Sequence, residues 1–169
     1  MKRLINILVL LAVVSGSFNL SYGQNSKKAA RQAAVKNMVD STRFYFNAEY
    51  ALPQRGGMKN LTSIYDVKIT KDSINAFLPY YGQAYMAPDP GATEGGIKFI
   101  STNFSYKVNP GKKGGWEIII KPKDHDIGSW RDVQQLILHI SPDGYASLYV
   151  LSTNRDPISF QGNIIAKEL

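Results

Sequence analysis

The sequence predicts an α+β, mainly β fold: an N-terminal helix packed on a curled antiparallel sheet of about eight strands, barrel-like or folded as a sandwich. Apolar residues follow a helical stripe in one early segment. From residue 44 onward they alternate with polar residues at period two, in short runs separated by turn-forming residues. No linker or internal repeat interrupts the runs, so residues 24–169 are expected to form a single domain.

Residues 1–23 have the anatomy of a secretory signal peptide. Two cations open the segment, an apolar run over 4–14 follows, and the small residues Ser21 and Gly23 precede Gln24. The apolar run is shorter than a typical transmembrane span. We therefore expect an exported protein whose mature chain begins near Gln24 and works in the periplasm or outside the cell.

Composition excludes several classes of chemistry. The chain has no cysteine, which rules out disulfides, thiolate metal sites, cysteine nucleophiles and a lipid-modified cysteine anchor. The formal net charge is +7, and loss of Lys2 and Arg3 with a signal that holds no acid leaves +5. Because the lysines are dispersed and the protein is exported, we expect a solvated basic surface rather than nucleic-acid binding. No cofactor, metal site or membrane anchor is predicted, and the oligomeric state stays open.

The predicted helix runs from Ser26, a suitable N-cap, to about Thr42. Its apolar stripe includes Val35, Met38 and Val39. In the first strand, Phe44 to Leu52, the even-numbered residues from Phe44 through Tyr50 are expected to face the core together. The predicted strands are 44–52, 64–70, 73–78, 97–108, 116–121, 133–140, 145–152 and 158–165.

The clearest turn is Ser141-Pro142-Asp143-Gly144, in which proline presets one dihedral angle and glycine accepts a left-handed conformation. A second turn is expected at Asn154-Arg155-Asp156-Pro157.

An aromatic block between the halves of the sheet gives the candidate ligand contacts. Tyr80, Tyr81 and Tyr85 lie among prolines and glycines, and Trp130 sits in a polar loop. Tyrosine offers a stacking face and a hydroxyl, which suits a carbohydrate-like ligand. The structural alternative is an irregular, bulged strand whose tyrosines fill the core with hydroxyls at the rim, with Trp130 as a plug under its loop.

The same block carries a family resemblance. The run Leu78–Tyr85, the step Gly95–Phe99, the turn Asp143–Ala146 and Gly162 together resemble the domain-of-unknown-function family 4251, small exported proteins mainly of Bacteroidetes. The similarity runs from about residue 30 to the C-terminus. It implies bacterial origin and export, and it implies no activity.

Catalytic constellations are weak, so the protein is not expected to be an enzyme. Asp124-His125-Asp126 is the one place where an imidazole adjoins carboxylates, but neighbouring loop residues seldom converge on one ion. His139 is expected to point out of its strand. Glu49 and Glu117 alternate with apolar residues and should face water, not each other across a cleft.

The leading functional hypothesis is a non-catalytic binding module of the bacterial cell envelope, whose concave side holds an apolar or carbohydrate-like ligand. The alternative is a structural or interaction protein of the envelope that meets a partner through an open sheet edge or the Trp130 loop. A filled barrel interior would favour the alternative. Asp40-Ser41-Thr42 and Asp72-Ser73-Ile74 also match a short pattern for O-linked glycosylation in Bacteroidetes.

Overall fold

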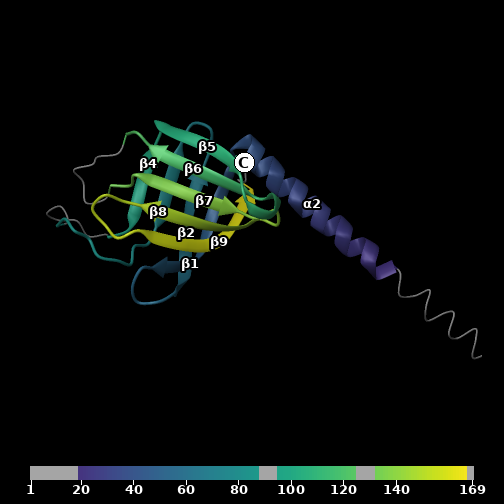
Figure 1. Cartoon of the computed structure of the whole chain (residues 1–169), viewed down its shortest axis with the longest axis horizontal. Helices are drawn as coiled ribbons and strands as arrows, with labels where there is room; N and C mark the ends of the chain where they lie inside the picture. Colours follow the sequence, from purple (N-terminus) through teal and green to yellow (C-terminus); the bar gives the residue numbers. More distant parts are fainter. Residues whose placement is uncertain (1–18, 88–94, 125–131, 167–169) are drawn as a thin grey trace, which may run out of the picture.

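The computed structural model describes residues 19–87, 95–124 and 132–166 (Figure 1). One helix packs against a nearly closed, barrel-like antiparallel sheet of nine strands. The predicted fold class is therefore confirmed, with nine strands in place of about eight. Among the described residues, no helix combines the length and the apolar character needed to cross a membrane.

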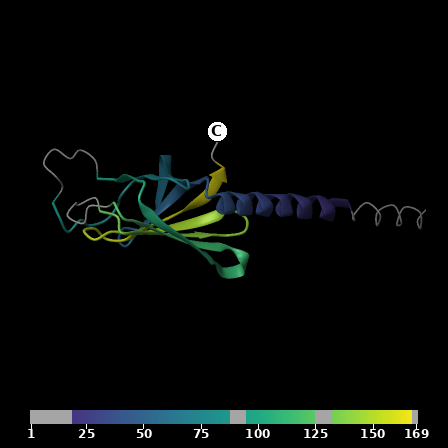
Figure 2. The same cartoon turned by 90° about the horizontal axis from the view of Figure 1, so that it is seen from above.

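Helix α2 spans Asn19–Ser41 and touches the barrel only near its C-terminal end. Val35 and Val39 are buried there, and Met38 packs beside them. The N-terminal part projects away from the barrel (Figures 1 and 2). The helix begins before the predicted cap at Ser26, because the preceding residues continue it without a break. It ends at Thr42, whose φ of 50° is left-handed.

Nine strands follow in chain order. They are β1 (Phe44–Pro53), β2 (Lys59–Ile69), β3 (Ile74–Leu78), β4 (Ile97–Ser101), β5 (Phe104–Pro110), β6 (Trp116–Pro122), β7 (Gln135–Ile140), β8 (Tyr145–Leu151) and β9 (Ile158–Ala166). A short 3-10 helix, η1 (Lys112–Gly114), joins β5 to β6.

All neighbouring strands are antiparallel, in the order β4-β3-β2-β1-β9-β8-β7-β6-β5. The sheet thus consists of two meanders, β1–β4 and β5–β9, that meet where β1 pairs with β9. Its two edge strands, β4 and β5, are consecutive in the chain and joined through Thr102 and Asn103. This arrangement curls the sheet almost onto itself.

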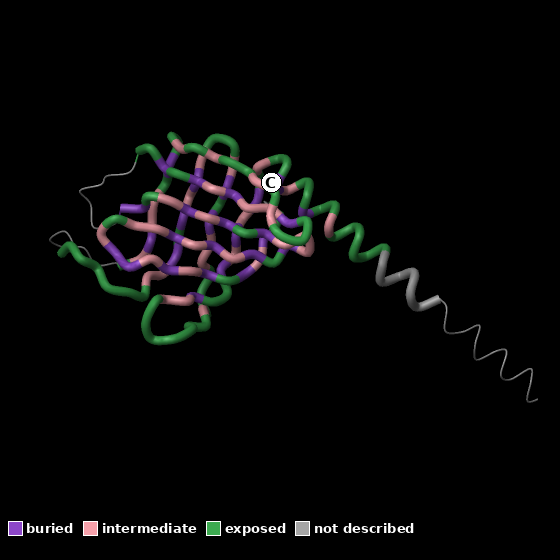
Figure 3. Tube along the Cα trace, in the orientation of Figure 1, coloured by how far each residue is buried: buried purple, intermediate pink, exposed green. Residues whose placement is uncertain are grey.

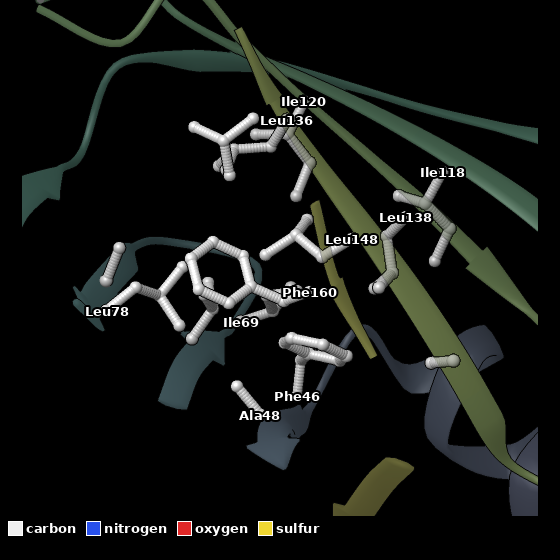
Figure 4. Close-up of a cluster of buried hydrophobic side chains, with 14 of the residues drawn as sticks. Phe46, Ala48, Ile69, Leu78, Ile118, Ile120, Leu136, Leu138, Leu148 and Phe160 are labelled. Carbon is white, nitrogen blue, oxygen red and sulfur yellow. The ribbon is translucent and has the colours of Figure 1, made fainter. Parts of the chain in front are cut away.

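Alternate residues of the strands fill the interior. Figure 3 shows buried and less buried positions alternating along the strands, as the period-two pattern predicts. Figure 4 shows Phe46 and Phe160 meeting aliphatic side chains from other strands, among them Leu78, Leu138 and Leu148. These five side chains are at most 2% exposed. The core is a packed aliphatic and aromatic interior that draws on β1 and on strands of both meanders.

The predicted turn at Ser141–Gly144 is confirmed and also seats the helix. Gly144 has a φ of +85°, and its N–H donates to the Ser141 carbonyl at 2.9 Å. An added Cβ at Gly144 would lie 3.1 Å from a methyl carbon of Val35. Glycine therefore serves both the turn conformation and the close approach of α2.

One predicted strand was wrong in its extent. Residues 97–108 form two strands, β4 and β5, because the chain turns a corner at Thr102 and Asn103. The Asp124 carboxylate holds this corner by accepting the Ser101 hydroxyl at 2.5 Å and the backbone N–H groups of Thr102 and Asn103 at 3.0 and 3.3 Å. These bonds lower the pKa of Asp124, the Ser101 bond most of all.

Candidate functional site

A groove of about 890 Å³ runs over the outer face of the sheet, across β1, β9, β8, β7 and β6 and up to the β5–β6 hairpin. Its polar side chains are Glu49, Lys112, Glu117, His139, Ser141, Ser147 and Gln161, and its aromatic ones are Tyr50, Trp116 and Tyr145. Since neighbouring strands lie about 4.8 Å apart, β1 and β6 are separated by roughly 19 Å along the sheet. The groove therefore suits an elongated ligand.

A β-bulge shapes one end of the groove. The register of β1 against both neighbours shifts between Ala48 and Tyr50. As a result Glu49 and Tyr50 are both exposed and both line the groove, while Ala51 is buried. The sequence-based expectation that Tyr50 shares the inward face of Phe44 was wrong, because an inserted residue reverses the alternation.

Across the middle of the groove, four polar side chains stand in register on neighbouring strands. Gln161 of β9 lies opposite Ser147 of β8, Ser147 opposite His139 of β7, and His139 opposite Glu117 of β6. Side chains paired in this way lie about 5 Å apart on one face. The row supplies an amide, a hydroxyl, an imidazole and a carboxylate within one line.

The two groove carboxylates are oriented by asparagine amides from adjacent strands. Asn163 Nδ2 donates to Glu49 Oε1 at 3.1 Å, and Asn109 Nδ2 donates to Glu117 Oε1 at 3.0 Å. The second oxygen of Glu117 lies 3.7 Å from His139 Nδ1, which is ion-pair range but too long for a hydrogen bond. Glu49, Glu117 and His139 all point outward, as alternation predicted.

Helix α2 reaches the rim of the groove. The Arg31 guanidinium lies over the Tyr145 ring, 5.1 Å from its centroid. The next residue of the helix, Gln32, donates its Nε2 hydrogen to Asp143 Oδ1 at 3.0 Å. Tyr145 is 63% exposed, so its ring remains accessible beside this contact.

The tyrosines predicted as ligand contacts lie on a different part of the molecule. Tyr80 is half-buried, and Tyr81 and Tyr85 are 38% and 64% exposed. The Tyr80 hydroxyl donates to the carbonyls of Gln83 and Asp156 at 2.9 and 3.1 Å. Tyr85 donates its hydroxyl to the Asp156 carboxylate. None of the three lines the groove, and Trp130 lies outside the described residues.

These tyrosines pack against the turn between β8 and β9. Arg155 is only 1% exposed, donates to the carbonyls of Gly95 and Gly96 at 3.1 and 3.3 Å, and stacks over Tyr80 at 5.0 Å. Burial raises the pKa of Tyr80 to about 12, while the Tyr85 hydrogen bond lowers the pKa of Asp156. The block thus has a structural role in tying the β3–β4 connection to the β8–β9 turn. Its role in ligand contact stays a prediction.

The other residues singled out in the sequence are the Asp124-His125-Asp126 segment and the two serines of the glycosylation patterns. His125 and Asp126 lie outside the described residues, and Asp124 is engaged at the β4–β5 corner. Among the residues that the structure describes, no group of three or more histidine or carboxylate side chains could hold a metal ion. Ser41 is exposed and bonds the Met38 carbonyl, and Ser73 is half-buried beside Thr70. Glycosylation of either serine stays a prediction.

Together, the fold and groove define a class: a small barrel-like β protein with one N-terminal helix and a polar groove on its outer face. The chain belongs to the DUF4251 family, a domain of unknown function whose model matches residues 26–164. The predicted family membership is therefore confirmed.

A solved structure has the same fold. The crystal structure of a DUF4251 family protein from Bacteroides eggerthii DSM 20697 matches with a TM-score of 0.59 and 17% sequence identity. The match covers 82% of this chain and 91% of that one. No curated protein matches the chain.

Proposed function

We propose that this protein is an exported, non-catalytic binding module of the bacterial cell envelope, and that the outer groove holds a carbohydrate-like ligand. The observation that carries the proposal is the in-register row Gln161, Ser147, His139 and Glu117, flanked by Tyr50 and Tyr145. Sugars present hydroxyls for the row and apolar ring faces for the tyrosines.

The groove supports this function better than the barrel interior does. Phe46 and Phe160 are fully buried and meet aliphatic side chains across the barrel (Figure 4). A ligand in that space would have to displace close-packed core. We therefore move the site from the concave side, where the sequence suggested it, to the outer face.

A non-catalytic role fits the chemistry of the row. Glu49 and Glu117 stand four strands apart, roughly 19 Å along the sheet, whereas glycoside hydrolysis needs two carboxylates within about 10 Å. Among the described residues, Ser147 makes no hydrogen bond to His139 that would activate it as a nucleophile. The nearby backbone N–H groups are engaged in the sheet ladder and so offer no oxyanion hole.

The experiment is a glycan-array screen followed by calorimetry on the best ligand. Tyr145→Ala and Gln161→Ala should each weaken binding about tenfold, or about 1.4 kcal/mol. Tyr149→Ala is the matched control, because Tyr149 faces outward on the same strand but does not line the groove. It should bind within about twofold of wild type. Equal affinity of all three variants for the ligand, or the absence of any ligand on the array, would refute the groove as the binding site.

The aromatic block provides a second, separable proposal for ligand contact. Tyr81 and Tyr85 are both exposed, but only Tyr81 has a hydroxyl that makes no hydrogen bond to the described residues. If the block binds ligand, Tyr81→Ala reduces retention without lowering the melting temperature. A fall in melting temperature with unchanged retention would assign the block to structure alone.

A second candidate function is an interaction protein of the envelope. Two observations favour it. The barrel interior is filled by packed side chains, and the edge strands β4 and β5 each pair with another strand on one side only among the described residues. Such edges can accept an extended segment of another chain. Val108→Pro on β5 should then abolish capture of an envelope partner while groove ligands still bind; retained capture would count against this function.

A further inference from the structure

We propose that the groove selects oligosaccharides that carry free amino groups. The inference rests on the proposed function and names the substrate class of the same site. It follows from how the two groove carboxylates are held, from a cation already seated on one groove aromatic, and from the distance between the carboxylates.

Glu49 and Glu117 are carboxylates that asparagine amides orient and that no lysine or arginine in the described part of the chain neutralises. Each accepts one amide hydrogen bond, from Asn163 and Asn109 respectively. Among the described residues, no lysine or arginine lies within ion-pair distance of either carboxylate, and His139 is the one titratable group beside Glu117. Amides orient a carboxylate without neutralising it, so both groups keep their charge for a ligand.

This negative charge contrasts with the rest of the protein. The chain carries a net charge of +7, with 20 lysines and arginines against 13 acids. The groove is lined by two carboxylates and one lysine: Glu117 of β6 lies at the same end as Lys112 of the β5–β6 hairpin, and Glu49 lies at the opposite end on β1. An ammonium group is therefore attracted most strongly to the Glu49 end of the groove, although the protein as a whole repels cations.

The rim provides an independent sign of cation binding. The Arg31 guanidinium sits 5.1 Å from the centroid of Tyr145, a residue that lines the groove. A tyrosine face attracts a cation, and since Arg31 already occupies this one, the ring left for a ligand ammonium is Tyr50. Tyr50, at the other end, offers a second exposed ring beside Glu49.

The spacing of the carboxylates favours a polymer over a small cation. A single ammonium group cannot contact two carboxylates roughly 19 Å apart along the sheet. A chain of amino sugars repeats its charge along its length and reaches both, while its hydroxyls meet the row Gln161, Ser147 and His139 between them.

The test is calorimetry of the mature protein with three hexasaccharides of equal length: glucosamine, N-acetylglucosamine and glucose. At about pH 6.5, the glucosamine hexamer should bind about tenfold more tightly than the other two. The double variant Glu49→Gln/Glu117→Gln should reduce that advantage to about twofold or less. Raised salt should shrink it in wild type, since screening weakens exposed charge interactions.

Asp66→Asn is the matched control, because Asp66 is a strand carboxylate outside the groove. It should leave the preference unchanged. Equal binding of all three sugars would overturn the charge selectivity and leave the proposed function standing. Binding of none would overturn both, and so would binding of a lysine hexapeptide alone, which would make the occupant a peptide.

Discussion

Gly162→Ala is expected to be among the most damaging single-methyl changes in this protein. Gly162 lies on β9 opposite Ala48, next to the β1 bulge. A Cβ at this position would lie 1.9 Å from the Asn47 carbonyl oxygen, well inside the 3.0 Å below which real Cβ contacts essentially never occur. The clash is with backbone, so β1 and β9 must separate by about 1 Å, enough to break ladder bonds of roughly 2.9 Å.

The loss of two or three such bonds, at about 1 kcal/mol each, predicts destabilisation of about 2–4 kcal/mol. For a domain of this size that lowers the melting temperature by about 5–15 °C. Thermal unfolding followed by circular dichroism measures it. Gly95→Ala is the control, since an added Cβ there meets nothing within 4 Å. If Gly162→Ala and Gly95→Ala melt within about 2 °C of each other, the backbone clash is not real.

Three further predictions concern buried or hydrogen-bonded polar groups. Arg155→Met removes the hydrogen bonds to the carbonyls of Gly95 and Gly96 and should lower the free energy of unfolding in urea by about 2–4 kcal/mol. The control Arg43→Met, at an exposed position, should lower it by about 0.5 kcal/mol or less. Equal effects of the two variants would contradict a stabilising role for the buried guanidinium. Hydrogen bonds lower the pKa of Asp124 in the folded state. The stability that Asp124 contributes is therefore present above the ordinary carboxyl pKa and is lost as the pH falls below it. Asp124→Asn should therefore lose less stability than wild type between about pH 5 and pH 2, and parallel acid curves would exclude this contribution. Burial raises the pKa of Tyr106 to about 12. The stability that the neutral Tyr106 contributes is therefore fully present below the ordinary tyrosine pKa of 10.0 and is lost as the pH rises toward 12. Tyr106→Phe should spare about 1–2 kcal/mol of that alkaline loss, and a tyrosinate titration of wild type without a late step would refute the shift.

The fold class was predictable because period-two alternation runs through most strands. Consecutive hairpins order β5 to β9, so the face shared by Glu117, His139, Ser147 and Gln161 follows from alternation and simple meander pairing. Sequence reasoning placed Glu117 and His139 outward but did not align them with Ser147 and Gln161. The strand register set by the β7–β8 and β8–β9 turns was the signal that could have shown Ser147 and Gln161 to lie in line with His139.

Two features could not be predicted from the sequence because they lie at contacts between residues far apart in the chain. The bulge at Glu49 leaves no mark in composition, and it lies beside the close approach of β1 to Gly162 of β9, which is distant in sequence. Similarly, alternation continues through residues 97–108, and the break comes from Asp124, which is distant in sequence. The start of β2 at Lys59 was missed since its first residues are mostly polar and exposed.

The pairing of β1 with β9 has a consequence for how the molecule is made. These are the first and last strands that the structure describes, and Phe44 pairs with Ala166. On the ribosome, β1 can pair with β2 early, but its other side stays open until the C-terminal residues emerge. The nascent chain therefore waits as two unjoined meanders, and the contacts that unite them are of long sequence separation, which slows folding. A chain that lacks most of β9 would leave the meanders β1–β4 and β5–β8 without the β1–β9 pairing that joins them.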